Sequence, residues 1–370
     1  MKKFKTQNLI IINLFIIGHV FFLIILFLPL LSYTRDTAED PNWQSSQNEV
    51  RKVNLQEVMR FSDVPEKEIY FKRPSNIKLD DNGNIYIQDN PHILKFGPDG
   101  KFLIKLIGEG QGPGELVDDF IGNLSNFALV GNEVIAFSGY PYKIMWFNEK
   151  GEFQKEKKLP MGRGPQYFVT PNLNYYILEE EIPPRNKLPN VGPFKYSILL
   201  CLIIPDFKDK EVIHTWSLEG MADKNDPART KRPEYVVVDS DTLVVNTTDE
   251  YEFITLNLKN DKKLKTFTHK YKREKFSTKS KKGYYPAIRT MYYVSPELWV
   301  VTWTKDKDGF PLICAHDLET GNVEEFYLRF PESDSDRRYY SRSMTIVKGF
   351  IFMIEQSPEG FYNIVKYQIE

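Results

Sequence analysis

The chain of 370 residues carries 49 basic and 50 acidic residues, for a formal net charge of −1. This balance excludes a whole-surface field of the kind that recruits nucleic acid, so any charged site must be local. Aromatic residues make up 14% of the chain and two cysteines are present, which suits packed strand faces and excludes a disulfide framework. Both cysteines, Cys201 and Cys314, lie in apolar runs and are expected to be buried free thiols.

The first 35 residues predict an export or membrane segment. Lys2, Lys3 and Lys5 precede Leu9–Leu31, which is almost wholly apolar and long enough to cross a hydrocarbon core of about 30 Å. Residues 1–35 are therefore either an uncleaved membrane anchor or a cleaved signal peptide, and the length of the apolar run favours the anchor. The basic residues keep the amino terminus in the cytoplasm, which places the rest of the chain on the extracytoplasmic side. Cleavage would make it a secreted protein.

Residues 36–48 form a polar stretch that predicts a short tether, and residues 49–370 predict one all-β domain. Its first run, Val50–Met59, has helical as well as strand features, and we interpret it as a strand. The end of the chain supplies three strands of what is otherwise a four-stranded unit. Residues 50–59 are therefore expected to be the missing outer strand beside Tyr362–Ile369, which would leave no open sheet edge.

Four β-rich runs lie between Pro74 and Ile107, and turn sequences such as Asp81-Asn82-Gly83 separate them. Asn-Gly and Asp-Gly pairs supply the positive φ angles that tight hairpins need, so the runs predict four antiparallel strands in succession. A sheet this small cannot bury both of its faces alone. It needs similar sheets stacked on each side.

The same unit recurs along the chain. Ile144–Phe153 matches Ile93–Phe102 in the pattern I-x-x-F-x-x-x-G-x-F, which predicts the same hairpin in two units. Less regular copies are recognised by polar turns between β-rich runs. The predicted units are Pro74–Ile107, Leu124–Leu159, Gln166–Leu218, Glu234–Tyr271, Ala287–Phe330 and Ser341–Glu370. With four strands per unit, they predict a six-bladed β-propeller whose ring is closed by the two terminal strands.

The chain resembles the six-bladed β-propeller proteins of bacterial envelopes related to NHL-repeat domains. Asn84–Asp89, Ile93–Phe102 and the glycine-rich Ile107–Glu115 carry the resemblance, which is only architectural beyond the second unit. It implies a scaffold that binds a ligand or an envelope protein, since such propellers serve as binding modules and occasionally as enzymes. Ile107–Glu115 lacks the Gly-Lys-Ser/Thr ending of a phosphate loop, and it predicts a tight crossing between units.

Arginines recur where one unit passes to the next. The resemblance implies that these links surround one mouth of a central channel, where arginine forks suit carboxylate or sulfate groups. The candidate ligand-binding residues are Arg73, Arg163, Arg232, Arg289, Arg342, Tyr285 and Tyr340. They predict an anionic ligand, such as an acidic glycan or an acidic peptide. The same charge runs also occur as ordinary solvated loops.

No motif in the sequence demands catalysis or a cofactor. His92, His214, His269 and His316 fall on different units without a metal-ligand spacing, so we expect no metal and no catalytic residues. The principal expectation is a non-catalytic binding scaffold. The alternative is a metal-dependent hydrolase or lyase whose ligands converge on the central channel from distant units.

Overall fold

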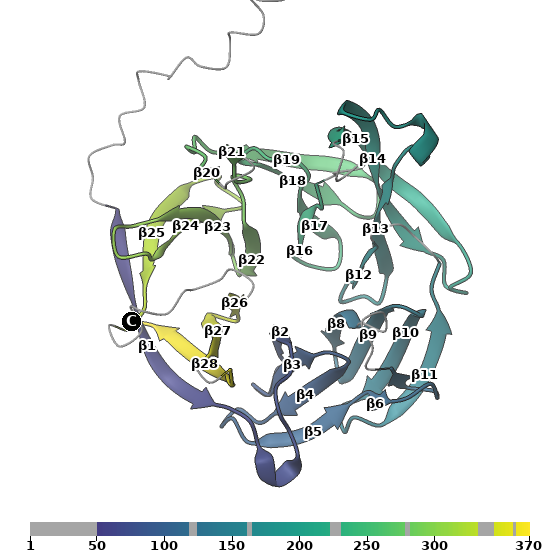
Figure 1. Cartoon of the computed structure of the whole chain (residues 1–370), viewed down its shortest axis with the longest axis vertical. Helices are drawn as coiled ribbons and strands as arrows, with labels where there is room; N and C mark the ends of the chain where they lie inside the picture. Colours follow the sequence, from purple (N-terminus) through teal and green to yellow (C-terminus); the bar gives the residue numbers. More distant parts are fainter. Residues whose placement is uncertain are drawn as a thin grey trace, which may run out of the picture. The chain divides into compact units, whose positions relative to one another are not determined.

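The computed structural model describes residues 50–117, 124–160, 165–222, 231–277, 282–331, 344–357 and 360–370. These residues form an all-β, propeller-like arrangement in which small sheets follow one another around a centre (Figure 1). Helical structure in this part of the chain is limited to two 3-10 turns, η1 (Pro65–Lys67) and η2 (Arg185–Lys187). No helix among the described residues is long and apolar enough to span a membrane. The predicted span Leu9–Leu31 and the tether lie outside these residues.

Four of the sheets have four strands each, and every strand is antiparallel to its neighbour. The first sheet contains β2 (Pro74–Leu79), β3 (Ile85–Asp89), β4 (His92–Phe96) and β5 (Phe102–Leu106). The second contains β8 (Leu124–Val130), β9 (Glu133–Gly139), β10 (Tyr142–Asn148) and β11 (Phe153–Lys158). The third contains β12 (Gln166–Val169), β13 (Tyr175–Glu181), β14 (Gly192–Ile203) and β15 (Lys210–Ala222). The fourth contains β16 (Glu234–Val237), β17 (Thr242–Asn246), β18 (Glu252–Asn257) and β19 (Lys262–Thr268).

The remaining long strands form one eight-stranded sheet in the order β22-β23-β24-β25-β1-β28-β27-β26. Its first half contains β22 (Thr290–Val294), β23 (Glu297–Lys305), β24 (Pro311–Asp317) and β25 (Val323–Arg329). Its second half contains β1 (Arg51–Phe61), β28 (Tyr362–Ile369), β27 (Phe350–Gln356) and β26 (Met344–Val347). Two short pairs lie in connections, β6 (Gly108–Glu109) with β7 (Glu115–Leu116) and β20 (Lys275–Ser277) with β21 (Lys282–Tyr284).

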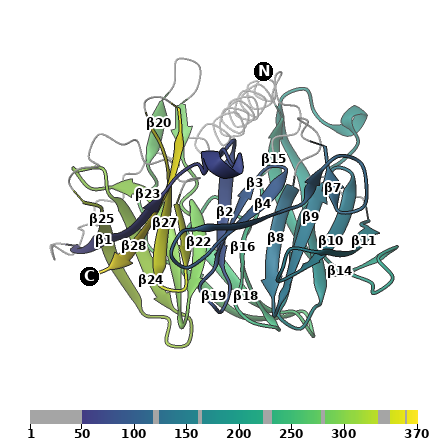
Figure 2. The same cartoon turned by 90° about the horizontal axis from the view of Figure 1, so that it is seen from below.

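Strand β1 joins the two halves of this sheet. Residues from Leu55 to Phe61 pair antiparallel with β28, the terminal strand beside which the sequence places residues 50–59 (Figure 2). Residues from Arg51 to Asn54 instead run parallel to β25, a pairing that the sequence did not predict. Strand β1 is long enough to pair with β25 along its first third and with β28 along the rest.

The repeated hairpin predicted from the sequence is confirmed. Phe96 pairs with Phe102 beside a bulge, and Phe147 pairs with Phe153 beside a bulge at the equivalent position. The two ring pairs have centroid distances of 5.6 and 5.9 Å. The turn glycines, at positions 100 and 151, have φ angles of 79° and 78°, which residues with a Cβ adopt only with strain.

Strand β9 shows why many of these runs are apolar without interruption. Val134 and Ala136 pack toward the first sheet, whereas Ile135 and Phe137 pack toward the third. Successive side chains of a strand point to opposite faces, so a strand between two neighbouring sheets needs apolar residues at both parities. Stacking on both faces therefore explains the continuous runs.

Six hydrophobic clusters among the described residues hold neighbouring sheets together. In one cluster Trp299 and Val301 of β23 pack with Met353 of β27 and Tyr367 of β28, so the two halves of the eight-stranded sheet face each other. Another cluster packs β2, β3 and β4 against β27 and β28, which joins the last strands of the chain to the first sheet. The two cysteines are buried free thiols, as predicted.

Candidate functional site

The first strands of the sheets and β26 lie nearest the centre of the arrangement (Figure 1). Polar side chains link them. Asn76 of β2 donates through Nδ2 to Asn126 Oδ1 of β8 at 2.8 Å, and Asn126 Nδ2 lies 3.5 Å from the Tyr235 hydroxyl of β16. Tyr292 of β22 donates to the Met344 carbonyl of β26 at 2.5 Å. The centre is therefore lined by hydrogen-bonding groups from several sheets.

Four of the seven predicted site residues lie in the described part of the chain. Arg73 and Arg289 immediately precede β2 and β22, Arg232 lies two residues before β16, and Tyr285 lies five residues before β22. Arg73 and Arg232 are exposed, and Arg232 makes no hydrogen bond or ion pair with any described residue. The other three candidates, Arg163, Arg342 and Tyr340, lie outside the described residues.

Arg289 has the most distinctive surroundings of these residues. Its guanidinium carbon lies 4.5 Å from the ring centroid of Trp303, on which Tyr285 also stacks at 4.3 Å. Its Nε is buried without a hydrogen-bond partner, and no described acidic side chain forms an ion pair with it. Burial lowers the pKa of Arg289, although an arginine keeps its charge at any physiological pH. The result is a desolvated cation on an aromatic support.

Two ionisable residues at the start of β16 were not predicted. Burial raises the pKa of Glu234, the first residue of β16, to about 7, and lowers the pKa of Lys231 to about 8. Lys231 donates to Asn246 Oδ1 at 2.7 Å. Tyr292 is within electrostatic range of both Glu234 and Arg289, so the starts of β16 and β22 share one environment. We call Lys231, Glu234, Arg289, Tyr292 and Trp303 the inner-strand cluster.

The cluster combines two cations with one acid whose charge changes near neutral pH. Desolvated groups with shifted pKa values are typical of binding and catalytic sites, because the surroundings penalise a charge that a ligand then compensates. An anion beside Arg289 would stabilise its charged form, whereas Lys231 already lies 3.8 Å from Asp249 Oδ1. The cluster therefore suits an anionic group best when Glu234 is protonated.

Replacing Glu234 with Gln is expected to stabilise the protein at pH 8 and to have little effect near pH 4.5. Unfolding returns Glu234 to a pKa near its ordinary 4.5, so between pH 4.5 and about 7 the folded state holds a proton that the unfolded state has lost. The contribution to stability is complete below pH 4.5 and is lost as the pH rises through about 7. Gln cannot ionise, and the variant should gain roughly 2 kcal/mol at pH 8, with about 1.4 kcal/mol per pKa unit reduced for residual solvent contact.

Urea unfolding of both proteins at pH 5 and pH 8 measures this difference. Glu211→Gln is the matched control, because Glu211 is an exposed residue of β15. It should change the free energy of unfolding equally at both pH values. An equal effect of Glu234→Gln at both pH values would contradict the raised pKa of Glu234.

The glycine-rich loop Ile107–Glu115 folds around the carboxylate of its last residue, Glu115. Gly112 N donates to Glu115 Oε2 at 2.8 Å, and a Cβ on Gly110 would lie 2.2 Å from the same oxygen. The loop therefore folds around an internal anion, in the space where a phosphate loop would hold its ligand. This agrees with its interpretation as a tight connection between sheets.

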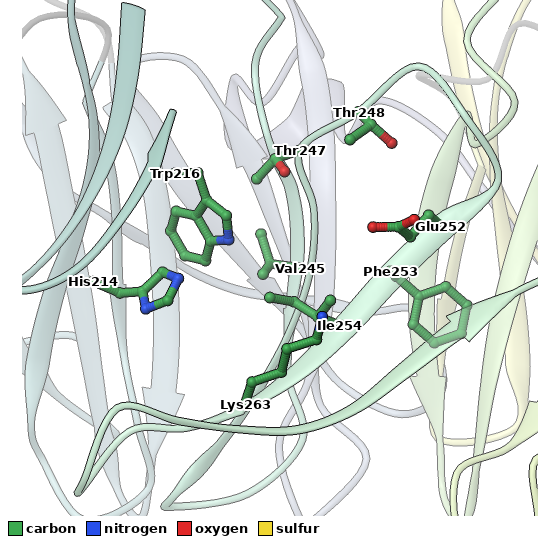
Figure 3. A pocket seen from close by; sticks show the side chains of 9 residues that line it. All are labelled: His214, Trp216, Val245, Thr247, Thr248, Glu252, Phe253, Ile254 and Lys263. Atoms are coloured by element: carbon green, nitrogen blue, oxygen red, sulfur yellow. The ribbon is translucent and has the colours of Figure 1, made fainter. Parts of the chain in front are cut away.

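A separate pocket of about 190 Å³ lies between β15 and the fourth sheet. Figure 3 shows His214 and Trp216 of β15 facing Ile254 and Lys263 across it. His214 Nδ1 lies 2.5 Å from Asp261 Oδ1, so its ring is already engaged. None of the predicted site residues lines this pocket.

Sequence reasoning missed Trp303, Glu234 and Lys231. The signal for Trp303 was available, since it ends the second predicted strand of its unit, 18 residues after Tyr285 and 14 after Arg289. Glu234 and Lys231 carried no such signal, because nothing in their neighbours along the chain indicates that they become desolvated.

No protein-family model and no curated protein matches the sequence. Among solved structures, a protein of Bacteroides fragilis described as a candidate exported protein is similar, with 13% identity and a TM-score of 0.54 over 85% of this chain and 95% of that one. A protein of unknown function from Bacteroides caccae has 13% identity and a TM-score of 0.43 over 69% and 81% of the two chains. The WD40 domain of Neurospora crassa Pan2 has 12% identity and a TM-score of 0.40 over 85% and 94%. The last two scores are too low to support an argument, and the first likeness is one of fold alone.

Proposed function

We propose that residues 49–370 are a six-bladed β-propeller that acts as an extracytoplasmic binding scaffold for an anionic ligand. Division of the eight-stranded sheet between β25 and β1 gives six four-stranded sheets in all. Each of the six hydrophobic clusters is then shared by two consecutive sheets, which supports a count of six blades. The parallel contact between these two strands is short, whereas the pairing of β1 with β28 is longer. The relation to NHL-repeat propellers remains part of this proposal.

The proposed location is the extracytoplasmic side of a membrane, with Leu9–Leu31 as the anchor. The support is the order of Lys2, Lys3 and Lys5 before a long apolar run. The description of the Bacteroides fragilis protein as a candidate exported one is compatible with the same location. Cleavage after the apolar run would give a secreted form of the same domain.

Arg289 carries the proposal for an anionic ligand. It is a partly buried cation on an aromatic ring, with Nε unpaired and with no ion pair to a described acid. A charge in this state is costly unless an anion compensates it. The metal-dependent alternative would need ligands near the inner strands, whereas the described group of His, Cys and Glu side chains includes residues of β24 and β25.

Replacing Arg289 with Ala is expected to weaken anion binding at least about tenfold, since a desolvated charged contact is commonly worth more than about 1.4 kcal/mol. Binding of two labelled probes, an oligogalacturonate and an oligoglutamate peptide, would be measured by fluorescence anisotropy with the purified full chain. Arg289→Lys should recover only part of the affinity, because Lys lacks the planar fork and stacks less well. Arg232→Ala should weaken binding less, since Arg232 is exposed.

Lys150→Ala is the matched control, because it removes an exposed cation from the hairpin between β10 and β11, away from the first strands. It should leave the affinity unchanged, and the melting temperature of each variant establishes that it is folded. High salt should weaken binding of the wild-type protein. Failure of both probes to bind at low salt, or binding by a folded Arg289→Ala variant equal to that of the wild-type protein, would reject the anionic ligand. Only the proposal of a propeller scaffold would then stand.

A further inference from the structure

Three side chains with metal-binding atoms meet between the fourth sheet and the first half of the eight-stranded sheet. His269 follows β19, Cys314 belongs to β24 and Glu325 belongs to β25. One ligand atom from each, the imidazole nitrogen, the thiol sulfur and a carboxylate oxygen, lies within 4.8 Å of the other two. His269 Nε2 is 2.7 Å from Glu325 Oε1, and Cys314 Sγ is 4.0 Å from the same oxygen.

A second layer of polar groups surrounds the thiol. The Tyr251 hydroxyl lies 2.7 Å from His316 Nε2 and also interacts electrostatically with the Cys314 thiol. His316 is 1% exposed and its Nδ1 has no partner in the described structure. When His316 Nε2–H donates to the Tyr251 oxygen, the Tyr251 hydroxyl proton is left to donate to a thiolate, and the same contact orients the Tyr251 ring.

The site has one closed side and one open side. The ring of Phe253 lies 4.9 Å from that of His316, and Cys314 is fully buried. Glu325 and His269 keep partial solvent exposure. A metal ion could enter from the side of these two residues, where a water molecule could also occupy a fourth coordination position.

We propose that His269, Cys314 and Glu325 bind a divalent transition metal of the zinc type. A set of one nitrogen, one sulfur and one oxygen ligand selects zinc, cobalt or copper over calcium and magnesium, which prefer oxygen alone. Three protein ligands with an open fourth position are typical of tetrahedral zinc sites that keep a water. Metal bonds of about 2.0–2.3 Å in a tetrahedron place ligand atoms roughly 3.3–3.8 Å apart, so side-chain movements of about 1 Å would complete the geometry.

Binding requires three changes in this site. The ion replaces the contact between His269 Nε2 and Glu325 Oε1, and the proton on Nε2 leaves that nitrogen, with Nδ1 carrying the ring proton of the neutral imidazole. The proton of the Cys314 thiol is released to solvent. The hydroxyl of Tyr251 then supports the resulting thiolate, in the way that outer hydrogen bonds support metal ligands generally.

Titration of the purified full chain with Co²⁺, after treatment with a chelator, tests the proposal. One equivalent should bind and produce a sulfur-to-cobalt charge-transfer band together with the visible bands of a tetrahedral ion. Zn²⁺ added later should remove these bands by displacement. Cys314→Ser should abolish the charge-transfer band, and His269→Gln and Glu325→Gln should each weaken binding by about tenfold or more.

Cys201→Ser is the matched control, because Cys201 is the other buried thiol, and it should leave both the spectrum and the affinity unchanged. His269 and Glu325 are partly exposed, so their variants keep the test valid if Cys314→Ser fails to fold. Absence of a stoichiometric cobalt complex, a complex without the thiolate band, or unchanged binding by folded His269→Gln and Glu325→Gln variants would each overturn the proposal. The contact between His269 and Glu325 would then be an ion pair between sheets and nothing more.

Discussion

Replacing Leu55 with Asp is expected to remove most of the stability of the domain. Leu55 is 3% exposed and packs in the cluster that joins the two halves of the eight-stranded sheet. It is also the residue of β1 that pairs with Ile369 of the terminal strand. Loss of a buried leucine costs about 2–5 kcal/mol, and burial of a carboxylate adds to this, against a total stability of about 5–15 kcal/mol.

Val58→Asp places the same charge on the same strand and is the matched control. Val58 is 43% exposed, so the free energy of unfolding should change by less than about 1 kcal/mol. Chemical unfolding followed by circular dichroism measures both variants. If Leu55→Asp and Val58→Asp unfold at the same denaturant concentration, β1 does not contribute to the core in the way described.

The second large effect is expected for Arg60→Met, at roughly 2–4 kcal/mol of destabilisation, because it removes the Arg60 cation from a buried carboxylate. Arg60 of β1 donates through Nη1 to Glu355 Oε2 of β27 at 2.6 Å. The Glu355 side chain is 6% exposed, and its other oxygen accepts from the Tyr367 hydroxyl at 3.2 Å. Arg60 also binds Glu57 and is partly exposed, which lowers the expected loss from the upper end of this range.

Arg51→Met tests the same change at an exposed ion pair of the same strand, since Arg51 and Glu324 lie 3.0 Å apart with both side chains largely exposed. It should cost less than about 1 kcal/mol. The double variant Arg60→Met with Glu355→Gln should recover much of the loss, because the buried charge is then gone. A loss for the double variant equal to the sum of the single losses would show that the two side chains do not interact.

The sequence predicted most reliably the features that depend on near neighbours in the chain. The two matching hairpins were predictable because a glycine at the turn and a phenylalanine on each flank determine their geometry locally. The strand character of Val50–Met59 was recognisable for a different reason. The terminal unit lacked a strand, and an unpaired edge is unfavourable.

The inner-strand cluster was only half predictable. The sequence placed Arg289 at the start of the first strand of its unit, but it did not reveal that Trp303 supports the guanidinium or that Nε lacks a partner among the described residues. Glu234 looked like any acid at the start of a strand. Its pKa shift arises from burial, which is a property of all the surrounding sheets and not of its neighbours in sequence.

The sequence by itself determined the hairpins, the buried thiols and the short apolar strand runs, because each of these is recognised from residues a few positions apart. Only the tertiary structure decided that β1 also runs beside β25, and that His269, Cys314 and Glu325 meet from separate strands. The physical reason is the stacking of sheets. It brings together side chains that are distant in the chain, and it sets their burial collectively through the packing of both faces of each sheet.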